Sequence, residues 1–570
     1  MDPLKQLKLN TKWVSTVASI WIQCTSGSLY TFSIYSSTLK TTQHYDQSTL
    51  DTVSVFKDIG ANLGILSGLL YTYSTKVHRS PHQQRQRRWI HFLGPWVVHL
   101  TGAIQCFTGY FLMWTSVVGL IPRPPIPVMC LFMLLAAHAM TFFNTADVVT
   151  SVRNFPSYSG TAVGIMKGFL GLSGAILIQV YQTIFRNKPT SFLLLLAILP
   201  TINALLLMWF VRIYDENEGD VKNLSSFSFI ALIVAAYLMV IIIMEQIFTL
   251  PLLGLVFALV VLLFLLASPL CVALRAQERD SGRISGTAFC EGDEISAAPH
   301  QMHARKTLAR EDPSGYHCLP SSSGEEMDTN DKRTSQRREN LNLLQAMCTV
   351  DFWILFSAMV CGMGSGLATV NNISQIGGSL GYSSLETSSL VSLWSIWNFL
   401  GRFGAGSVSD YFLRFRGWAR PLFMVITLAI MSIGHLVIAS GLPGALYAGS
   451  ILVGVCYGSQ WSLMPTVASD IYGVGHLGTI FNTITIANPV GSYIFSVRVI
   501  GYIYDREASG EGNTCTGTRC FMLSFLIMAS ATLLGSLAAL GLFFRTKRFY
   551  NDVILRRLLR SAREYNIQTP

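Results

Sequence analysis

The stretch WSIWNFLGRFGAGSVSDYFLR, residues 394–414, places Arg402 in the middle of an apolar, glycine-containing run. An arginine near the middle of a bilayer costs at least ~2.5–3.5 kcal/mol, so it normally faces a helix bundle or a watery cavity rather than lipid. Gly406, Asp410 and Arg414 follow at intervals of four residues and therefore lie on one face of a helix. The stretch predicts a membrane-spanning helix in which Arg402 has a functional role.

The composition is that of a polytopic membrane protein. Of 570 residues, 51% are hydrophobic and 13% are charged, about half of the ~25% usual in soluble domains, and the mean hydropathy is +0.44. The net charge of +10 comes from bases between apolar runs, which the positive-inside rule explains without a nucleic acid partner. No spacing of Cys and His suggests a metal, and no cofactor is expected. Among the cysteines, only Cys515 and Cys520 are placed to form a pair.

Fourteen apolar stretches are long enough to cross a ~30 Å hydrocarbon core, for which about 20 residues suffice. They form two sets of six, with two more stretches between the sets. The predicted spans are residues 13–37, 50–73, 95–117, 126–150, 160–184, 190–212, 226–247, 252–273, 351–371, 386–409, 420–440, 445–467, 478–503 and 519–544.

Lysine and arginine residues gather on one side of these spans. Lys12 precedes the first span, Arg153 follows the fourth, Arg414 follows the tenth, and the tail from Lys547 is basic. Cytosolic loops carry such an excess of bases, so both termini are predicted to be cytosolic. The loop at residues 515–520 then lies on the oxidising side, where a disulfide can persist. The plasma membrane, the vacuole and the endoplasmic reticulum all remain open as the location.

The two sets of six spans resemble each other weakly. Gly-Thr pairs at residues 160–161 and 478–479 open the fifth and thirteenth spans. In the second span, Gly68 aligns with the glycine of the Gly-x-x-x-Asp spacing, which brings Thr72 opposite Asp410 and leaves the first copy without its acid. Internal repeats of this kind predict two lobes with a binding site between them, near the bilayer midplane.

The chain is therefore predicted to be an all-α polytopic membrane protein, with two six-helix lobes and two extra helices between them. The polar segment after Arg275 has balanced charges and few aromatic residues, which is typical of disorder. The predicted parts are an N-terminal lobe at 1–212, two additional spans at 213–273, a disordered cytosolic linker at 274–348, a C-terminal lobe at 349–545 and a basic cytosolic tail at 546–570.

Longer strings carry a family resemblance. TFFNTADVVTSVRNFP around Asn144, GTAVGIMKGFLGLSGAI from Gly160 and GYFLMW from Gly109 resemble the plant nodulin-like domain of the major facilitator superfamily. The second half, with LATVNNISQIGGSLGY and the Gly-Arg of the tenth span, is similar to the oxalate/formate antiporter and monocarboxylate porter branch. The resemblance implies two major-facilitator lobes and a transport function, with substrates poorly defined.

The resemblance also implies roles for residues of the tenth span. The spacing of Gly406, Asp410 and Arg414 is similar to the superfamily's loop motif, which closes a short cytoplasmic loop, so these residues are candidates for gating. Arg402 can hold a carboxylate through a bidentate, charge-assisted pair, as an arginine does in the corresponding helix of the similar porters. The alternative is a structural arginine paired with backbone carbonyls or another span.

Other polar residues within the spans are weaker candidates. Lys57 and Asp58 are adjacent and point about 100° apart, so they cannot both face lipid unpaired. Lys57 is a candidate substrate ligand, and Asp58 is a candidate for coupling or an ion pair. Asn371 and Asn372, near the outer end of the ninth span, are polar enough to bind substrate, although an asparagine at a helix end is also an ordinary cap.

Asp147 and Lys167 lie at similar depths in the fourth and fifth spans, which a short loop joins. A mutual ion pair is the preferred interpretation. The alternatives are a substrate or coupling role for either residue, with Asp147 carrying a proton, because burial disfavours a charged carboxylate.

These features favour a secondary active transporter that works by alternating access. The expected cargo is a small organic anion such as a mono- or dicarboxylate, with proton coupling left open. The alternative is a membrane regulator or scaffold that keeps the transporter fold without transporting. An enzyme is not expected, since the sequence has no histidine cluster, Ser/His/Asp grouping or Walker-type phosphate loop. The oligomeric state is not predicted.

Overall fold

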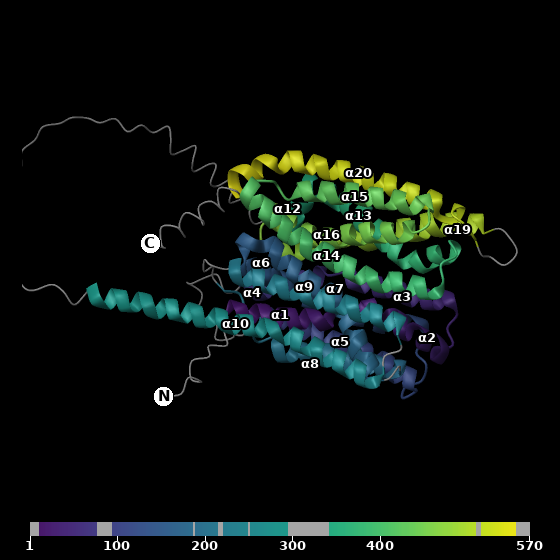
Figure 1. Ribbon diagram of the computed structural model, residues 1–570, viewed down its shortest axis with the longest axis horizontal. Helices are drawn as coiled ribbons and strands as arrows, with labels where there is room; N and C mark the ends of the chain where they lie inside the picture. Colours follow the sequence, from purple (N-terminus) through teal and green to yellow (C-terminus); the bar gives the residue numbers. More distant parts are fainter. Residues whose placement is uncertain are drawn as a thin grey trace, which may run out of the picture.

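The computed structural model describes residues 11–76, 94–185, 188–214, 221–248, 251–294, 341–508 and 515–554, which form helices joined by short turns. Figure 1 shows these helices running side by side along the long axis of the molecule. The first part of the chain occupies one half of the bundle and the last part the other half, which we call the N-terminal and C-terminal lobes. The all-α class predicted from the sequence is confirmed.

The helices follow the predicted spans closely. Those of the N-terminal lobe are α1 (Lys12–Ser26), α2 (Phe32–Gln43), α3 (Gln47–Asn62), α4 (Ile65–Lys76), α5 (Pro95–Val118), α6 (Ile126–Asn154), α7 (Ser159–Phe185) and α8 (Pro189–Leu207). The two additional helices are α9 (Val221–Ile247) and α10 (Leu252–Glu294). Those of the C-terminal lobe are α12 (Leu343–Met347), α13 (Val350–Ser379), α14 (Ser384–Arg416), α15 (Pro421–Ser440), α16 (Ala445–Tyr472), α17 (Leu477–Thr485), α18 (Ala487–Ser492), α19 (Tyr502–Glu507) and α20 (Arg519–Phe549).

Local sequence sets the limits of α14, the helix that carries Arg402. A capping box begins it: the Ser383 hydroxyl accepts from the Glu386 amide at 3.3 Å, and the Glu386 carboxylate accepts from the Ser383 amide at 2.8 Å. Gly417 ends it with a φ of +68°, a left-handed conformation that glycine adopts without strain. These signals leave Arg402 in the interior of an uninterrupted helix.

Three predicted spans are interrupted instead of continuous. A 3₁₀ turn at Ser28–Thr31 separates α1 from α2, and a short break separates α3 from α4. The thirteenth predicted span consists of α17, α18, a π-helical segment at Tyr493–Gly501 and α19. Pro489 lies in α18, where its missing amide removes one hydrogen bond of the helix ladder. The apolar periodicity alone did not predict these breaks.

Membrane crossing is supported by length and composition. Within the described ranges, nine helical stretches are long and apolar enough to cross a membrane. All fourteen predicted ranges coincide with a helix or with consecutive helices, and the five outside those nine stretches include two of the three interrupted spans, 13–37 and 478–503. The chain is a multi-pass membrane protein, and the figure of about fourteen crossings stays a prediction.

The lobes meet along a seam of helices that pack closely. In this seam α7 lies against α14, and α4 lies against α17. A Cβ atom added to Gly164 of α7 would lie 3.1 Å from the carbonyl oxygens of Arg402 and Phe403, so a larger residue would require the two helices to move slightly apart. The helix α9 contacts both α7 and α14 and therefore spans the edge of the seam.

The segment predicted to be a disordered linker is helical at its start. Helix α10 continues past Arg275 to Glu294 and projects beyond the bundle in Figure 1, so the prediction of disorder from Arg275 is wrong for this part. Residues 295–340 of the predicted linker, and residues 555–570 of the predicted basic tail, lie outside the described residues. The chain rejoins the C-terminal lobe where the Leu341 amide donates to the Tyr472 carbonyl at 3.1 Å.

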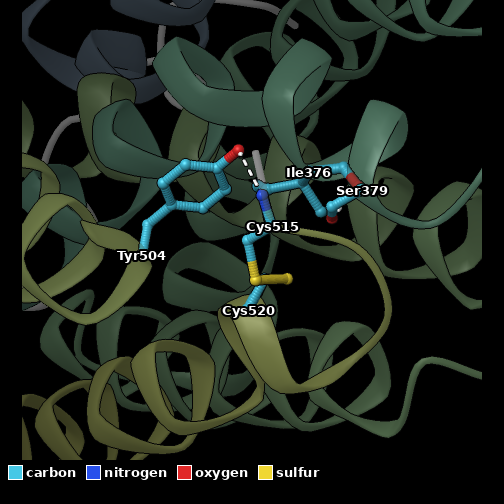
Figure 2. The surroundings of a disulfide bond; sticks show 5 residues. All are labelled: Ile376, Ser379, Tyr504, Cys515 and Cys520. Atoms are coloured by element: carbon cyan, nitrogen blue, oxygen red, sulfur yellow. Dashed lines mark hydrogen bonds between the residues drawn. A yellow bond between two sulfur atoms is a disulfide. The ribbon is translucent and has the colours of Figure 1, made fainter. Parts of the chain in front are cut away.

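The predicted pair of cysteines is confirmed. Cys515 and Cys520 form a disulfide with a Cα–Cα distance of 5.9 Å. Figure 2 shows the bond beside Tyr504, whose hydroxyl accepts from the Cys515 amide at 3.2 Å. The Gly517 amide donates to the Ser379 carbonyl at 2.8 Å, which ties the loop to the end of α13.

Candidate functional site

Lys167 of α7 and Arg402 of α14 meet across the seam between the lobes. Both are buried, with 0% and 1% of their surfaces exposed. The Arg402 Nη1 atom donates to the backbone carbonyl oxygen of Lys167 at 3.1 Å. Since each residue lies well inside its helix, the two basic groups come together in the interior of the bundle, at the junction of the lobes.

Two aromatic rings of the C-terminal lobe line this position. The Lys167 ammonium nitrogen lies 5.0 Å from the ring centre of Trp461 on α16 and 5.4 Å from that of Phe481 on α17. The Arg402 guanidinium carbon lies 5.5 Å from the same Trp461 ring. Aromatic faces attract cations at such distances by about 0.5–2 kcal/mol. The rings therefore stabilise both basic groups inside the bundle.

The two basic side chains differ in how they are held. Arg402 Nε donates to the Asn398 Oδ1 atom, one helical turn earlier, at 2.9 Å, and the guanidinium packs over Gly171 of α7. The Lys167 ammonium has no hydrogen-bond partner among the described residues. Burying an ammonium group without an acceptor is unfavourable. The Arg402 guanidinium is thus held in one position by its neighbours, whereas the Lys167 ammonium has room in its hydrogen bonding for an acceptor.

The predicted ion pair between Asp147 and Lys167 is wrong. Asp147 Oδ1 lies 3.0 Å from the His99 Nε2 atom of α5, inside the N-terminal lobe, whereas Lys167 faces the C-terminal lobe. The similar depths of the two residues did not determine which way each helix turns its side chain. Lys167 instead joins Arg402, the candidate substrate ligand.

Lys57 and Asp58 pair with each other. The Lys57 ammonium lies 3.3 Å from Asp58 Oδ1 and 5.0 Å from the Phe32 ring centre. The pair is partly exposed and lies beside Phe32, which precedes it in the N-terminal lobe. The structure therefore does not bring Lys57 to the Lys167–Arg402 position.

The two asparagines of α13 are also apart from that position. Asn371 is exposed, and Asn372 donates to the Ser496 hydroxyl at 2.8 Å and to the Ala368 carbonyl at 2.8 Å. These bonds satisfy the Asn372 amide group within the C-terminal lobe. A substrate role for either asparagine stays a prediction without a contact that favours it.

At one end of the seam, the Gly-x-x-x-Asp part of the sequence motif clamps α14 onto the start of α7. Asp410 accepts hydrogen bonds from the Gly160 amide at 3.1 Å, the Thr161 amide at 2.6 Å and the Thr161 hydroxyl at 2.8 Å. These amides belong to the N-terminal turn of α7, which lacks intrahelical acceptors and favours a negative charge. Gly406 permits the approach, because a Cβ there would collide with the Gly160 carbonyl oxygen.

Arg414, the last residue of the motif, strengthens the same clamp. Its Nε atom donates to the Ser157 carbonyl oxygen at 3.1 Å, and Nη2 donates to the same oxygen. The guanidinium carbon lies 3.3 Å from the centre of the Tyr158 ring. Both partners precede α7, so the motif joins two lobes rather than two helices of one lobe.

A buried charge network continues from the clamp into the C-terminal lobe. Arg420 pairs with Asp410 at 2.6 Å and with Asp470 of α16. The Tyr550 hydroxyl donates to Asp470 at 2.8 Å. The network links the clamp to Tyr550, directly after α20, and buried charges that share hydrogen bonds in this way favour one arrangement of the groups.

The contact between α4 and α17 resembles the one between α14 and α7, as the predicted internal repeat would require. Gly68 of α4 packs against Gly478 of α17, where an added Cβ would lie 2.5 Å from the Gly478 carbonyl carbon. Thr72, the counterpart of Asp410, is buried and its hydroxyl has no hydrogen-bond partner within the described part of the chain. The first copy of the clamp thus keeps the close glycine contact without the acid.

Several residues of the site were not predicted from the sequence. Asn398 precedes Arg402 by four residues, a spacing that could have indicated its contact. His99 is a lone histidine in an apolar helix, and Trp461 and Phe481 have no distinguishing pattern around them. Within the described ranges, no three His, Cys, Asp or Glu side chains are grouped to hold a metal ion.

Two family models match the chain. The Nodulin-like model matches residues 12–78 and 89–274, and the NFD4 C-terminal domain model matches residues 339–552. The chain is 25% identical over 566 residues to Protein NUCLEAR FUSION DEFECTIVE 4 of Arabidopsis thaliana, which covers 95% of this chain and 90% of that protein. It is 28% identical over 136 residues to the probable transporter MCH1 of Yarrowia lipolytica, covering 22% of this chain and 27% of that one.

Among solved structures, the proton:xylose symporter XylE bound to 6-bromo-6-deoxy-D-glucose superimposes with a TM-score of 0.53. The alignment covers 92% of this chain and 94% of XylE at 13% identity, which shows the fold alone. The chain carries a Nodulin-like domain followed by an NFD4 C-terminal domain, on the fold of the major facilitator superfamily.

Proposed function

We propose that the chain is a secondary active transporter that carries a small organic anion, such as a mono- or dicarboxylate, between its two lobes. The observation that carries the proposal is the pair of buried basic side chains, Lys167 from one lobe and Arg402 from the other. The Yarrowia lipolytica relative, named a probable transporter, supports transport as the activity. Arg402 and Lys167 would be the main ligands of the cargo.

An anionic cargo would supply the negative charge and the hydrogen-bond acceptors that Lys167 and Arg402 can use. The Lys167 ammonium needs an acceptor, and a guanidinium is suited to a planar carboxylate. A charge-assisted hydrogen bond contributes about 1.5–3 kcal/mol. The faces of Trp461 and Phe481 would pack against the apolar part of a small organic acid. A neutral cargo such as a sugar would leave the ammonium uncompensated.

Two contacts between the lobes at one end of the seam support alternating access. The Asp410 clamp joins the lobes at the start of α7, and the Gly68–Gly478 contact joins them at the start of α17. Both helix starts are predicted to lie on the cytosolic side. We infer that the conformation described here is closed to the cytosol and that transport requires these contacts to open.

The proposed orientation puts both termini and the linker in the cytosol. Its basis is the excess of Lys and Arg at the ends of spans that lie on one side, including Arg153 and Arg414. We expect protease to cleave tags at both termini in vesicles that expose the cytosolic face, while a tag inserted between residues 508 and 515 stays protected. Protection of one terminal tag but not the other would require an odd number of crossings.

The proposed cargo class can be tested by uptake into vesicles that contain the purified protein. A panel of labelled pyruvate, lactate, oxalate, malate, glucose, alanine and zinc covers anionic, neutral and cationic solutes. We expect exchange of at least one carboxylate, competition among carboxylates, and no uptake of the neutral or cationic compounds.

Two other results would contradict the proposal. Uptake of glucose with no response to carboxylates would remove the anion assignment. No uptake of any solute by a folded, correctly inserted protein would favour the alternative predicted from the sequence, a membrane regulator that keeps the transporter fold.

A further inference from the structure

The N-terminal lobe contains a histidine–aspartate pair that the anion site does not use. His99 of α5 and Asp147 of α6 are both 0% exposed, and His99 Nε2 lies 3.0 Å from Asp147 Oδ1. The other ring nitrogen, Nδ1, lies 3.2 Å from the Pro95 carbonyl oxygen. The Phe143 ring stacks on the imidazole with a centre distance of 6.3 Å. The imidazole is therefore fixed between two oxygen atoms, one of Pro95 and one of Asp147.

This geometry determines how many protons the pair holds. The Pro95 carbonyl can only accept, so Nδ1 carries a hydrogen. Nε2 and Asp147 Oδ1 lie at hydrogen-bond distance, so one more proton lies between them, on the nitrogen or on the oxygen. With that proton the pair has no net charge. When that proton is lost, the pair consists of an Asp147 carboxylate and a neutral His99, and its net charge is −1. The remaining ring hydrogen then lies either on Nδ1, facing Pro95, or on Nε2, facing the carboxylate.

Polar groups around the pair are ready to respond to loss of that proton. Ser19 and Gln23 of α1 lie beside the Asp147 carboxylate. Asp147 Oδ2 and both polar atoms of the Gln23 amide are buried without a hydrogen-bond partner among the described residues. Buried polar atoms are normally paired, so this group of unpaired atoms marks a place where hydrogen bonds can rearrange. The Gln23 amide can donate to the carboxylate when it becomes charged.

Within the part of the chain that the structure describes, His99 is the basic side chain that pairs with Asp147, and other ionisable groups lie nearby. Tyr71 of α4 interacts with Asp147, and its hydroxyl bonds to the Thr150 hydroxyl at 2.9 Å. Arg153, later on α6, lies 5.1 Å from the Tyr71 ring centre and donates to the carbonyls of residues 474 and 475. Lys167 of α7 faces Trp461 in the other lobe.

The pair is connected to the seam by its own helix. Thr145, two residues before Asp147, bonds to the Ser67 hydroxyl at 2.8 Å and accepts from the Asn482 amide at 2.7 Å. Asn482 belongs to α17 and follows Phe481, the ring beside Lys167. A shift of α6 at Asp147 would therefore reach a contact between the lobes and one wall of the anion site.

We propose that His99 and Asp147 form the proton site of a proton-coupled transport cycle. The proton leaves the Nε2–Oδ1 hydrogen bond to water, the pair goes from neutral to −1, and α6 adjusts its contact with α17. The pair would bind a proton on one side of the membrane and release it on the other, in step with the anion. The coupling rests on the proposed transport function, whereas the proton site itself does not.

The first experiment needs no substrate. Infrared difference spectra of the purified protein after steps in pH are expected to contain carboxyl and imidazole bands from the pair. Asp147→Asn should remove the carboxyl band, and His99→Gln should shift it. His138→Gln is the matched control, because His138 is a buried histidine of the same lobe that bonds to Gln105 and the Leu63 carbonyl rather than to an acid. Spectra of Asp147→Asn identical to those of the unaltered protein would overturn the proposal.

The second experiment uses labelled pyruvate in vesicles. With one proton per anion, a pH difference of one unit can sustain about a tenfold accumulation ratio. We expect Asp147→Asn and His99→Gln to lose this accumulation while keeping pyruvate counterflow at equal pH, and His138→Gln to keep both. Accumulation at the ratio of the unaltered protein in Asp147→Asn would refute coupling at this pair.

The two experiments separate two kinds of failure. If the unaltered protein exchanges no pyruvate or other carboxylate, the proposed function fails, and the infrared bands alone decide whether the pair is a proton site. If one variant does not fold, the other supplies both measurements, since each removes a different member of the pair.

Discussion

Arg402→Ala is expected to reduce carboxylate uptake by about ten- to a hundredfold, since one charge-assisted hydrogen bond contributes about 1.5–3 kcal/mol. Arg402→Lys keeps the charge but loses the planar pair of donors, so it should weaken apparent affinity while the protein stays folded. Lys167→Met should impair uptake to a similar extent. Initial uptake rates normalised to inserted protein, at several carboxylate concentrations, measure these effects.

Thermal stability distinguishes a binding role from a structural one. Two basic groups are buried beside each other at this site, and Lys167 has no acceptor in the described residues, so Lys167→Met should leave the unfolding temperature unchanged or raise it. Arg545→Ala is the matched control, because Arg545 is an exposed arginine that pairs with Asp351 away from the seam. An Arg402→Ala protein with normal stability and full uptake would remove Arg402 from the site.

The second large effect is expected at the clamp. Gly406→Ala would push a methyl group into the Gly160 carbonyl oxygen of the other lobe, and this backbone atom has little room to move. Overpacking of this kind costs about 1–3 kcal/mol, which corresponds to about a 5- to 150-fold shift between two conformations. The shift should favour the conformation that is open at the cytosolic end, and transport should slow because the closed state forms less often.

The matched control lies two residues away on the same helix. A Cβ atom added to Gly404 meets nothing within 4 Å, so Gly404→Ala should leave the balance of conformations unchanged. Spin labels at Tyr73→Cys and Phe415→Cys, two exposed positions on α4 and α14, can report the distance between the lobes at this end. Equal distance distributions for Gly406→Ala and Gly404→Ala would show that the glycine contact does not control opening.

Much of the fold follows from local properties of the sequence. Apolar length predicted the positions of the helices, because a chain in lipid must satisfy its backbone hydrogen bonds within each helix. The cost of burying a charge marked Arg402, and spacing of four residues placed Gly406, Asp410 and Arg414 on one face. Each of these inferences depends on a single helix, so sequence alone was sufficient for it.

The partners of the buried charges depended on the tertiary structure. Depth in the membrane suggested that Asp147 and Lys167 pair, but depth does not fix how a helix is rotated about its axis. Packing turns α6 so that Asp147 meets His99, and turns α7 so that Lys167 meets Arg402 and Trp461 of the other lobe. The sequence by itself determined which residues must be buried and which must find partners. Only the packing of the helices decided which partner each one has, because a hydrogen bond requires two groups to meet within about 3 Å.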